Sequence, residues 1–159
     1  MCNLYGWQNP LPKEWLSSQA ALQEQIVARE REFNMRPVLP AFAGHVPAAL
    51  KRVYPNIKTT RVSEWGGFAD QYRCTFLNPM DSLYAIIQKE YLTEQTRLYG
   101  TNHIYGIDPF NEIDPPSWDA DSLGMMAKHI YESVAAVDPE AVWLQMTWLF
   151  YADIKHWTT

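Results

Sequence analysis

Apolar residues recur at helical spacing in three stretches of the chain, residues 12–34, 81–99 and 121–137. In each stretch the apolar positions lie three or four residues apart with charged residues between them, which is the pattern of an amphipathic helix. Asp81 is placed to cap the start of the second helix, and Gly100 is placed to end it. The pattern therefore predicts three long helices.

Short apolar runs separate these helices, at residues 36–42, 103–110 and 141–150. Prolines and glycine bound the first run, a single charge interrupts the second, and the third is apolar almost throughout. Each run is therefore predicted as a buried strand. Residues 46–54 suit a brief helix, and residues 58–79 are predicted as a long irregular connection of the kind that usually carries function.

The predicted order is helix, strand, helix, strand, helix, strand. This alternation indicates the α/β class, with a parallel sheet and right-handed crossovers, either doubly wound or part of a (β/α)₈ barrel. Three strands do not decide between these two architectures. No G-x-G-x-x-G or G-x-x-x-x-G-K-[ST] motif follows a predicted strand, so a nucleotide-binding domain loses its usual support.

Composition and charge exclude several classes of function. The 159 residues are 47% hydrophobic and 19% charged, as in one ordinary globular domain. The net charge of −5 and the lack of a basic cluster argue against a nucleic-acid partner. No apolar run approaches the ~18 residues of a membrane span, and no signal-peptide pattern opens the chain. Cys2 and Cys74 are the two cysteines, and no zinc-ligand spacing occurs, so no metal is predicted.

The ends of the predicted strands supply candidate site residues, since His45, Asn111, Glu112 and Trp148 would lie on one rim of the sheet. A glutamate beside an amide and aromatic rings suits general acid catalysis on a glycosidic bond. Glu112 equally suits an exposed position after a strand, and Asn111 a turn. Trp65, beside two glycines in the long connection, is a candidate for stacking on a sugar. His45 has the blander alternative of a hydrogen-bonded strand end, and Trp148 suits a core position equally well.

Glycoside hydrolysis needs a second carboxylate across the sugar, at ~5 to 5.5 Å in retaining enzymes and ~6.5 to 9.5 Å in inverting ones. Asp108 and Asp114 are the nearest carboxylates to Glu112 in the sequence. Residues that face each other across a sugar normally come from different strands, however. The chain therefore offers no convincing partner for Glu112.

Five sequence segments resemble a known family, the glycoside hydrolases of family 89 or α-N-acetylglucosaminidases, over nearly the whole chain. They are NLYGWQNPLPKEW near the start, MRPVLPAFAGHVP at 35–47, SEWGGF at 63–68, LYGTNHIYGIDPFNEIDPP at 98–116 and AVDPEAVWLQMTWLF at 136–150. The combination of PVLPAFAGHVP with FNE-x-x-PP is highly specific to that family.

The resemblance implies a (β/α)₈ catalytic barrel of which this chain holds about three strands. It implies retaining exo-hydrolysis of terminal α-linked N-acetylglucosamine, in glycans of the heparan sulfate type, with no metal and no cofactor. Carried over by motif, Glu112 matches the acid/base with Asn111 beside it, and Trp65 and Trp148 match aromatic residues of the sugar pocket. The family further implies a lysosomal or secreted location for the parent enzyme.

The family's nucleophile is another glutamate on a later strand, whereas this chain ends at Thr159. Residues 1–159 are therefore expected to be a segment of a single catalytic domain, with the remainder of the barrel as a partner and no activity alone. The alternative is a catalytically silent, carbohydrate-binding remnant of such a barrel. A doubly wound small-molecule domain unrelated to sugars is the third reading.

Two departures from the family pattern affect the expected site. Family members commonly read W-x-x-Q-G-W-L-F, where this chain has WLQMTW at 143–148. Some animal members pair a cysteine at the position of Cys74 with one at the position of Asp70, so Cys74 is expected to be a free thiol.

Overall fold

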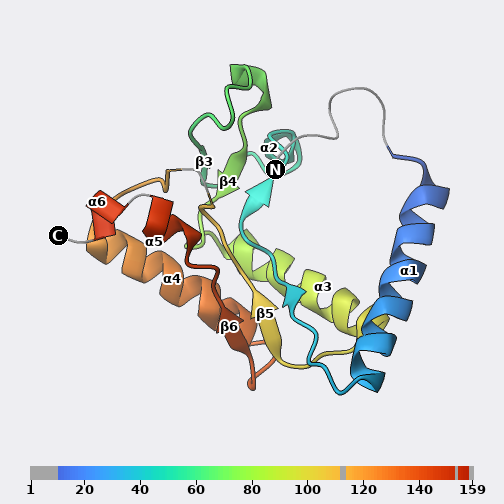
Figure 1. The fold of residues 1–159 in the computed structure, drawn as a ribbon. Helices are drawn as coiled ribbons and strands as arrows, with labels where there is room; N and C mark the ends of the chain where they lie inside the picture. The colour runs from blue at the N-terminus through green and yellow to red at the C-terminus, as the bar shows by residue number, and fades with distance from the viewer. Residues whose placement is uncertain (1–10, 112–113, 153, 158–159) are drawn as a thin grey trace.

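The computed structural model describes residues 11–111, 114–152 and 154–157 (Figure 1). The helices of this described part are α1 (Lys13–Glu32), α2 (Leu50–Val53), the 3₁₀ turn η2 (Asp70–Tyr72), α3 (Ser82–Tyr99), α4 (Ala120–Ala135), α5 (Trp148–Ala152) and α6 (Ile154–Trp157). Its strands are β1 (Leu39–Pro40), β2 (His45–Val46), β3 (Thr59–Arg61), β4 (Thr75–Leu77), β5 (Ile104–Gly106) and β6 (Val142–Leu144).

The three long helices lie where the apolar periodicity predicts them. The Asp81 carboxylate accepts a hydrogen bond from the backbone N–H of Leu83 at 3.0 Å, which caps α3. Gly100 ends α3 with φ 68°, a conformation that glycine adopts without strain. α4 begins at its own cap, Asp119, whose carboxylate accepts from the backbone N–H of Ser122 at 2.8 Å.

A parallel sheet in the order β1-β5-β6 forms the centre of the fold. Leu39 pairs with Tyr105, and Tyr105 pairs with Trp143. The crossover connections contain α3 and α4, which lie side by side against one face of this sheet (Figure 1). The predicted α/β class with parallel strands and helical crossovers is therefore confirmed.

The two faces of the parallel sheet differ in burial. Tyr105 and Ile107 point toward α3 and α4, where they are 2% and 1% exposed in the larger apolar core. On the opposite face Val38, Val142 and Leu144 remain 43%, 52% and 48% exposed. Because side chains alternate along a strand, the second face is the side that a closed barrel would enclose.

Polar side chains of α3 explain why β1 is shorter than the predicted first strand. The Gln95 amide donates to the carbonyl of Pro40 at 2.7 Å, and the Gln88 carbonyl oxygen accepts from the N–H of Phe42 at 2.9 Å. The hydroxyl of Tyr84 donates to the carbonyl of Phe42, also at 2.9 Å. The backbone groups of Pro40 and Phe42 are thus hydrogen-bonded to side chains of α3. In a longer strand, such groups would pair with the backbone of a neighbouring strand.

A second, antiparallel sheet in the order β2-β4-β3 corrects two predictions. The connection at residues 58–79 contains β3, η2 and β4, so the prediction of an irregular loop is wrong. His45 was predicted at the end of the first parallel strand, but it lies in β2 and pairs with Phe76. Both strands of the β3–β4 pair are too short to show an alternating pattern, and the pairing depends on contacts distant in sequence.

The third predicted strand is also corrected. β6 covers Val142–Leu144, and Trp148 begins the helix α5. A run of apolar residues does not by itself separate a buried strand from a helix.

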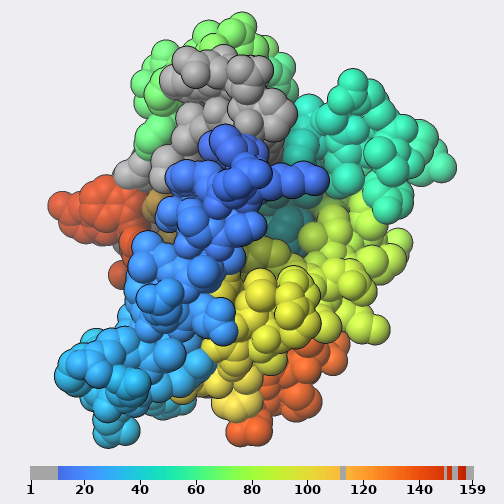
Figure 2. Space-filling view, turned by 90° about the vertical axis from the view of Figure 1, so that its right-hand side faces the viewer, coloured from blue at the N-terminus to red at the C-terminus, as the bar shows by residue number. Residues whose placement is uncertain are grey.

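The stripe predicted along α1 is largely exposed. Leu16, Leu22 and Ile26 are 49%, 49% and 41% exposed, whereas Val27 is buried. Arg31 anchors the C-terminal end of α1 by donating to the last carbonyl of α3 at 2.7 Å, and in Figure 2 α1 crosses the front of the molecule beside that end of α3. Within the described residues, none of the helices combines the length and apolar character needed to cross a membrane.

Candidate active site

The backbone that leaves β5 is anchored from both sides. The indole N–H of Trp143, in β6, donates to the carbonyl oxygen of Ile107 at 2.8 Å. Two residues further on, Nε2 of His45 donates to the carbonyl oxygen of Pro109, also at 2.8 Å. The carboxyl end of β5 is therefore held between the parallel sheet and the antiparallel sheet.

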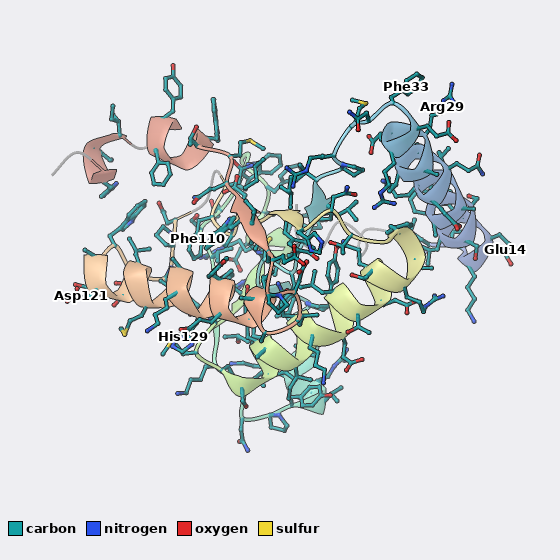
Figure 3. All side chains as sticks on the ribbon, turned by 90° about the horizontal axis from the view of Figure 1, so that it is seen from below. Glu14, Arg29, Phe33, Phe110, Asp121 and His129 are labelled. Carbon is teal, nitrogen blue, oxygen red and sulfur yellow. The ribbon has the colours of Figure 1, made fainter. Side chains whose placement is uncertain are left out.

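Asn111 and Glu112 follow this anchored segment. Phe110 is 6% exposed and packs against Phe76, with ring centroids 5.0 Å apart, in the interior of the molecule (Figure 3). Asn111 lies in the next turn and is exposed. Glu112, the predicted acid, lies outside the described residues. The buried ring of Phe110 thus holds the backbone two residues before Glu112 in the sequence.

His45 reaches this end of β5 from the second sheet. Burial of the ring lowers the pKa of His45 below its usual value, although the hydrogen bond to Pro109 opposes the shift. The ring also meets Phe76 edge-on at a centroid distance of 5.7 Å. Nε2 of His45 carries the proton in this hydrogen bond, since a carbonyl oxygen only accepts. His45 therefore has a structural role, because it holds the backbone at Pro109.

Trp65 lies in the β3–β4 loop beside the same segment. Its ring stacks on Phe68 with centroids 5.8 Å apart and remains 41% exposed. The Ser63 hydroxyl in this loop accepts a hydrogen bond from the N–H of Asp114 at 2.9 Å. The structure therefore joins the Trp65 loop to the segment that follows Asn111, which the sequence did not predict.

Ion pairs hold the base of the Trp65 loop. Asp70 pairs with Arg73 at 3.1 Å and with Arg61 at 2.7 Å. The hydrogen bond from Arg73 is the largest cause that holds the pKa of Asp70 below its usual range. The family resemblance implies a cysteine at the position of Asp70 in some animal members, whereas Asp70 here is engaged by two arginines.

Cys74 corrects the prediction of a free thiol, because it is disulfide-bonded. Cys74 is 8% exposed and packs in the smaller apolar core beside Phe76 and Phe110. The sequence contains one other cysteine, Cys2, which lies outside the described residues.

Trp148 follows the carboxyl end of β6, at the same end of the parallel sheet as Asn111. It is 41% exposed and its ring lies 5.4 Å from that of Tyr151 in α5. The structure thus places Trp65, Asn111, Trp148 and His45 around one end of the parallel sheet.

Asp108 lies two residues after the end of β5. Both of its carboxylate oxygens are buried and lack a hydrogen-bond partner among the described residues, and burial raises the pKa of Asp108 above its usual value. No group of three or more His, Cys, Asp or Glu side chains in the described part of the chain is arranged to hold a metal ion.

A different network occupies the opposite end of the sheet. Asp138 accepts from Nδ1 of His103 at 2.9 Å and from the hydroxyl of Tyr105 at 2.7 Å. Burial alone would raise the pKa of Asp138, but the hydrogen bonds from Tyr105 and His103 lower it below its usual range. This end of a barrel ordinarily serves stability.

Comparisons with known proteins agree on one family. The profile described as "Alpha-N-acetylglucosaminidase (NAGLU) tim-barrel domain" matches residues 1–159. Alpha-N-acetylglucosaminidase of Homo sapiens is 45% identical over 158 residues, which are 99% of this chain and 21% of the human protein. The chain therefore spans about a fifth of the length of this relative.

Solved structures of a family 89 glycoside hydrolase from Clostridium perfringens share the fold. Its complex with 2-acetamido-1,2-dideoxynojirmycin has a TM-score of 0.78 and 24% identity, covering 94% of this chain and 17% of the bacterial one. A variant with two Glu-to-Gln substitutions, in complex with its substrate GlcNAc-alpha-1,4-galactose, has a TM-score of 0.78 and 25% identity, covering 89% and 16%. The chain belongs to the α-N-acetylglucosaminidase (NAGLU) TIM-barrel family, related to the family 89 glycoside hydrolases, and its β1-β5-β6 sheet is part of a (β/α)₈ barrel.

Proposed function

We propose that residues 1–159 supply the acid/base side of a retaining α-N-acetylglucosaminidase active site, with Glu112 as the general acid/base. The match of the whole chain to the α-N-acetylglucosaminidase barrel family carries this proposal. In such barrels the catalytic groups lie at the carboxyl ends of the strands. Glu112 follows β5 in the sequence, after the buried Phe110 and the exposed Asn111, which supports that role.

In this mechanism Glu112 protonates the glycosidic oxygen of the leaving group while a second carboxylate, ~5 to 5.5 Å away, attacks the anomeric carbon. Glu112 then acts as a base and activates the water that hydrolyses the glycosyl intermediate. The substrate complex of the bacterial relative carries two Glu-to-Gln substitutions, which is consistent with a pair of glutamates. The second carboxylate would come from the remainder of the barrel, so residues 1–159 form a segment of a single catalytic domain.

The proposed substrates are glycans that end in α-linked N-acetylglucosamine, of the heparan sulfate type, hydrolysed from the terminus in a lysosomal or secreted enzyme. Trp65 and Trp148 are proposed to contact the sugar through their exposed rings, because aromatic faces stack on apolar faces of a ligand. Asn111 is proposed to donate and accept hydrogen bonds beside the acid. His45 is proposed to shape the pocket wall, since its Nε2 already holds the backbone after β5.

A chimera tests the proposal. The 159 residues would replace the matching segment of human α-N-acetylglucosaminidase, to which they are 45% identical, and hydrolysis of GlcNAc-α-1,4-galactose would be measured. Glu112→Gln should lower kcat by about 10²- to 10⁴-fold, which is the usual contribution of general acid catalysis. The matched control is Glu90→Gln, which changes an exposed glutamate of α3 and should leave the rate unchanged. Near-normal hydrolysis by the Glu112→Gln chimera would exclude Glu112 as the acid.

The same chimera tests the proposed role of Trp65. Trp65→Ala should lower kcat/KM by about 2- to 12-fold, the equivalent of ~0.5 to 1.5 kcal/mol of aromatic stacking. Trp15→Ala is the control, because Trp15 is similarly exposed at 48% but lies on α1. Equal effects of the two substitutions would contradict a sugar-stacking role for Trp65.

The chain by itself should bind the sugar weakly and not hydrolyse it. The reason is that the second carboxylate, which attacks the anomeric carbon, is proposed to come from the remainder of the barrel. Measurable turnover of 4-nitrophenyl α-N-acetylglucosaminide by the 159-residue chain would overturn this expectation. A chimera that folds, as judged by circular dichroism, and binds the sugar without hydrolysing it would favour the alternative hypothesis. In that alternative the chain is a catalytically silent, carbohydrate-binding remnant of a barrel.

A further inference from the structure

Trp65 and Phe68 are the first and last residues of one tight turn. The N–H of Phe68 donates a hydrogen bond to the carbonyl oxygen of Trp65 at 3.1 Å. The two central residues, Gly66 and Gly67, have φ of 61° and 71°. A type I′ turn requires positive φ at both central residues, and glycine adopts it without strain. The turn therefore brings the side chains of Trp65 and Phe68 together.

The ring of Phe68 stacks on Trp65 and lies across the turn. The two ring planes are inclined by 13° with centroids 5.8 Å apart, which is the geometry of an offset-stacked aromatic pair. A Cβ built on Gly66 would lie 3.4 Å from the Phe68 ring, so this ring also covers the backbone of the turn. Trp65 nevertheless remains 41% exposed. Phe68 thus contacts the indole and leaves much of it accessible.

Tyr72 supports Phe68 from the base of the loop. The Tyr72 ring meets Phe68 edge-on, with centroids 6.3 Å apart and planes at 78°. Tyr72 belongs to η2, which begins at Asp70, the residue paired with two arginines. In Figure 1 the β3–β4 loop (green) extends away from the parallel sheet. A row of three rings therefore connects Trp65 to the ion-paired base of this projecting loop.

We propose that Phe68 is a positioning residue for Trp65, because its ring holds the indole in the orientation that stacks on the terminal N-acetylglucosamine. This inference rests on the proposed function, in which Trp65 contacts the sugar. An exposed tryptophan side chain can occupy several rotamers, and ordering it on binding weakens affinity. A ring that already holds the indole in one orientation lowers that cost. Phe68 therefore strengthens sugar binding without touching the sugar.

A purely structural role of Phe68 would have a different kinetic signature. If Phe68→Ala only unfolded part of the protein, the concentration of active enzyme would fall, so kcat would decrease while KM stayed the same. Loss of positioning weakens binding of the substrate and of the transition state alike, so KM should rise while kcat stays the same. The two roles are therefore separated by measuring kcat and KM individually.

The experiment uses the chimera and 4-nitrophenyl α-N-acetylglucosaminide. Phe68→Ala should raise KM by about 2- to 12-fold, the range for one aromatic stacking contact, and by no more than Trp65→Ala does. In a chimera that already carries Trp65→Ala, Phe68→Ala should have no further effect, because no indole is left to position. An equal rise in KM in both backgrounds, or a fall in kcat alone, would overturn the inference.

Two conservative variants test whether the aromatic ring itself is needed. Phe68→Tyr keeps the ring and should keep the KM of the unmodified chimera. Phe68→Leu keeps an apolar side chain in the loop without a planar ring, and it should raise KM as Phe68→Ala does. An unchanged KM in Phe68→Leu would show that apolar bulk is sufficient and contradict positioning by stacking. Thermal unfolding of each variant checks that it is folded.

Phe33→Ala is the matched control. Phe33 is 63% exposed and lies at the C-terminal end of α1 (Figure 3), so its loss should leave KM unchanged. A rise in KM equal to that of Phe68→Ala would show that the effect is not specific to the Trp65 loop.

Failure of this inference differs from failure of the proposed function. If the unmodified chimera folds but does not hydrolyse the substrate, the proposed function fails. If the chimera is active and Trp65→Ala raises KM, but Phe68→Ala changes KM by less than about 2-fold, the proposed function stands and the role of Phe68 is wrong. If Trp65→Ala also leaves KM unchanged, the sugar contact of Trp65 is wrong and the positioning role fails with it.

Discussion

The imidazole of His45 donates a hydrogen bond to the carbonyl oxygen of Pro109 at 2.8 Å, across 64 positions of the chain. This contact joins β2 of the antiparallel sheet to the segment that leaves β5 of the parallel sheet. The proposed acid Glu112 lies three residues after Pro109 in the sequence. The placement of the candidate site therefore depends on a histidine of another sheet.

His45 should make stability depend on pH. Burial lowers its folded-state pKa, so its contribution is complete above the unfolded value of about 6.5 and is lost as pH falls through that value toward the folded one. His45→Gln removes this titration. The difference in unfolding free energy between the native sequence and His45→Gln, measured with denaturant, should shrink between pH 7.5 and pH 5.

The size of that change depends on the shift, at about 1.4 kcal/mol for each pKa unit. Parallel stability curves for the two proteins over this pH range would mean that His45 does not titrate with folding.

Gly44 should not tolerate a side chain. Its φ of +98° disfavours other residues, and an added Cβ would lie 2.4 Å from the fully buried ring of Phe76. Gly44→Ala should lower the unfolding free energy by about 1 to 3 kcal/mol, as overpacking does. Gly124→Ala is the control, because no atom lies within 4 Å of its added Cβ in α4, and it should stabilise by about 0.5 to 1 kcal/mol. Similar losses in both variants would contradict this explanation.

Asp138 should stabilise the end of the barrel opposite the candidate site. Asp138→Asn weakens the hydrogen bonds from His103 and Tyr105 and should lower the unfolding free energy by about 1.5 to 3 kcal/mol. Because the folded-state pKa of Asp138 is lowered, this stabilisation is present above the unfolded value and is lost as pH falls toward the folded one.

A double-mutant cycle with Tyr105→Phe checks the Asp138 network. Residues that share a hydrogen bond should show a coupling energy of at least about 0.5 kcal/mol. Strict additivity of Asp138→Asn and Tyr105→Phe would show that the two side chains do not stabilise one another.

Local chemistry made the helices predictable. The cap at Asp81 and the stop at Gly100 act within a few residues of the ends of α3, and apolar spacing follows the helical repeat. The same reasoning failed at Trp148, because an apolar run fits a strand or a helix equally well until its packing partners are known. Along α1 the predicted helix is confirmed, but Leu16 and Leu22 of its apolar stripe are exposed.

The candidate site was only partly predictable. Asn111 and Glu112 follow a run that the sequence marks as a strand, and the family motif supplies their expected role. The approach of the Trp65 loop depends on the hydrogen bond between Ser63 and Asp114, residues 51 positions apart. The disulfide at Cys74 likewise could not be inferred from the family's cysteine spacing, since Asp70 replaces the expected partner position.

The sequence by itself determined the α/β class, the three long helices and the family, because periodicity, caps and motifs are local properties. Tertiary structure alone decided the antiparallel β2-β4-β3 sheet, the anchoring of Pro109 by His45 and the burial of the Asp108 carboxylate. Strands of two or three residues carry too little local preference to specify their own pairing. Desolvation and hydrogen-bond partners depend on which distant segments pack around a residue, and only the folded chain brings those segments together.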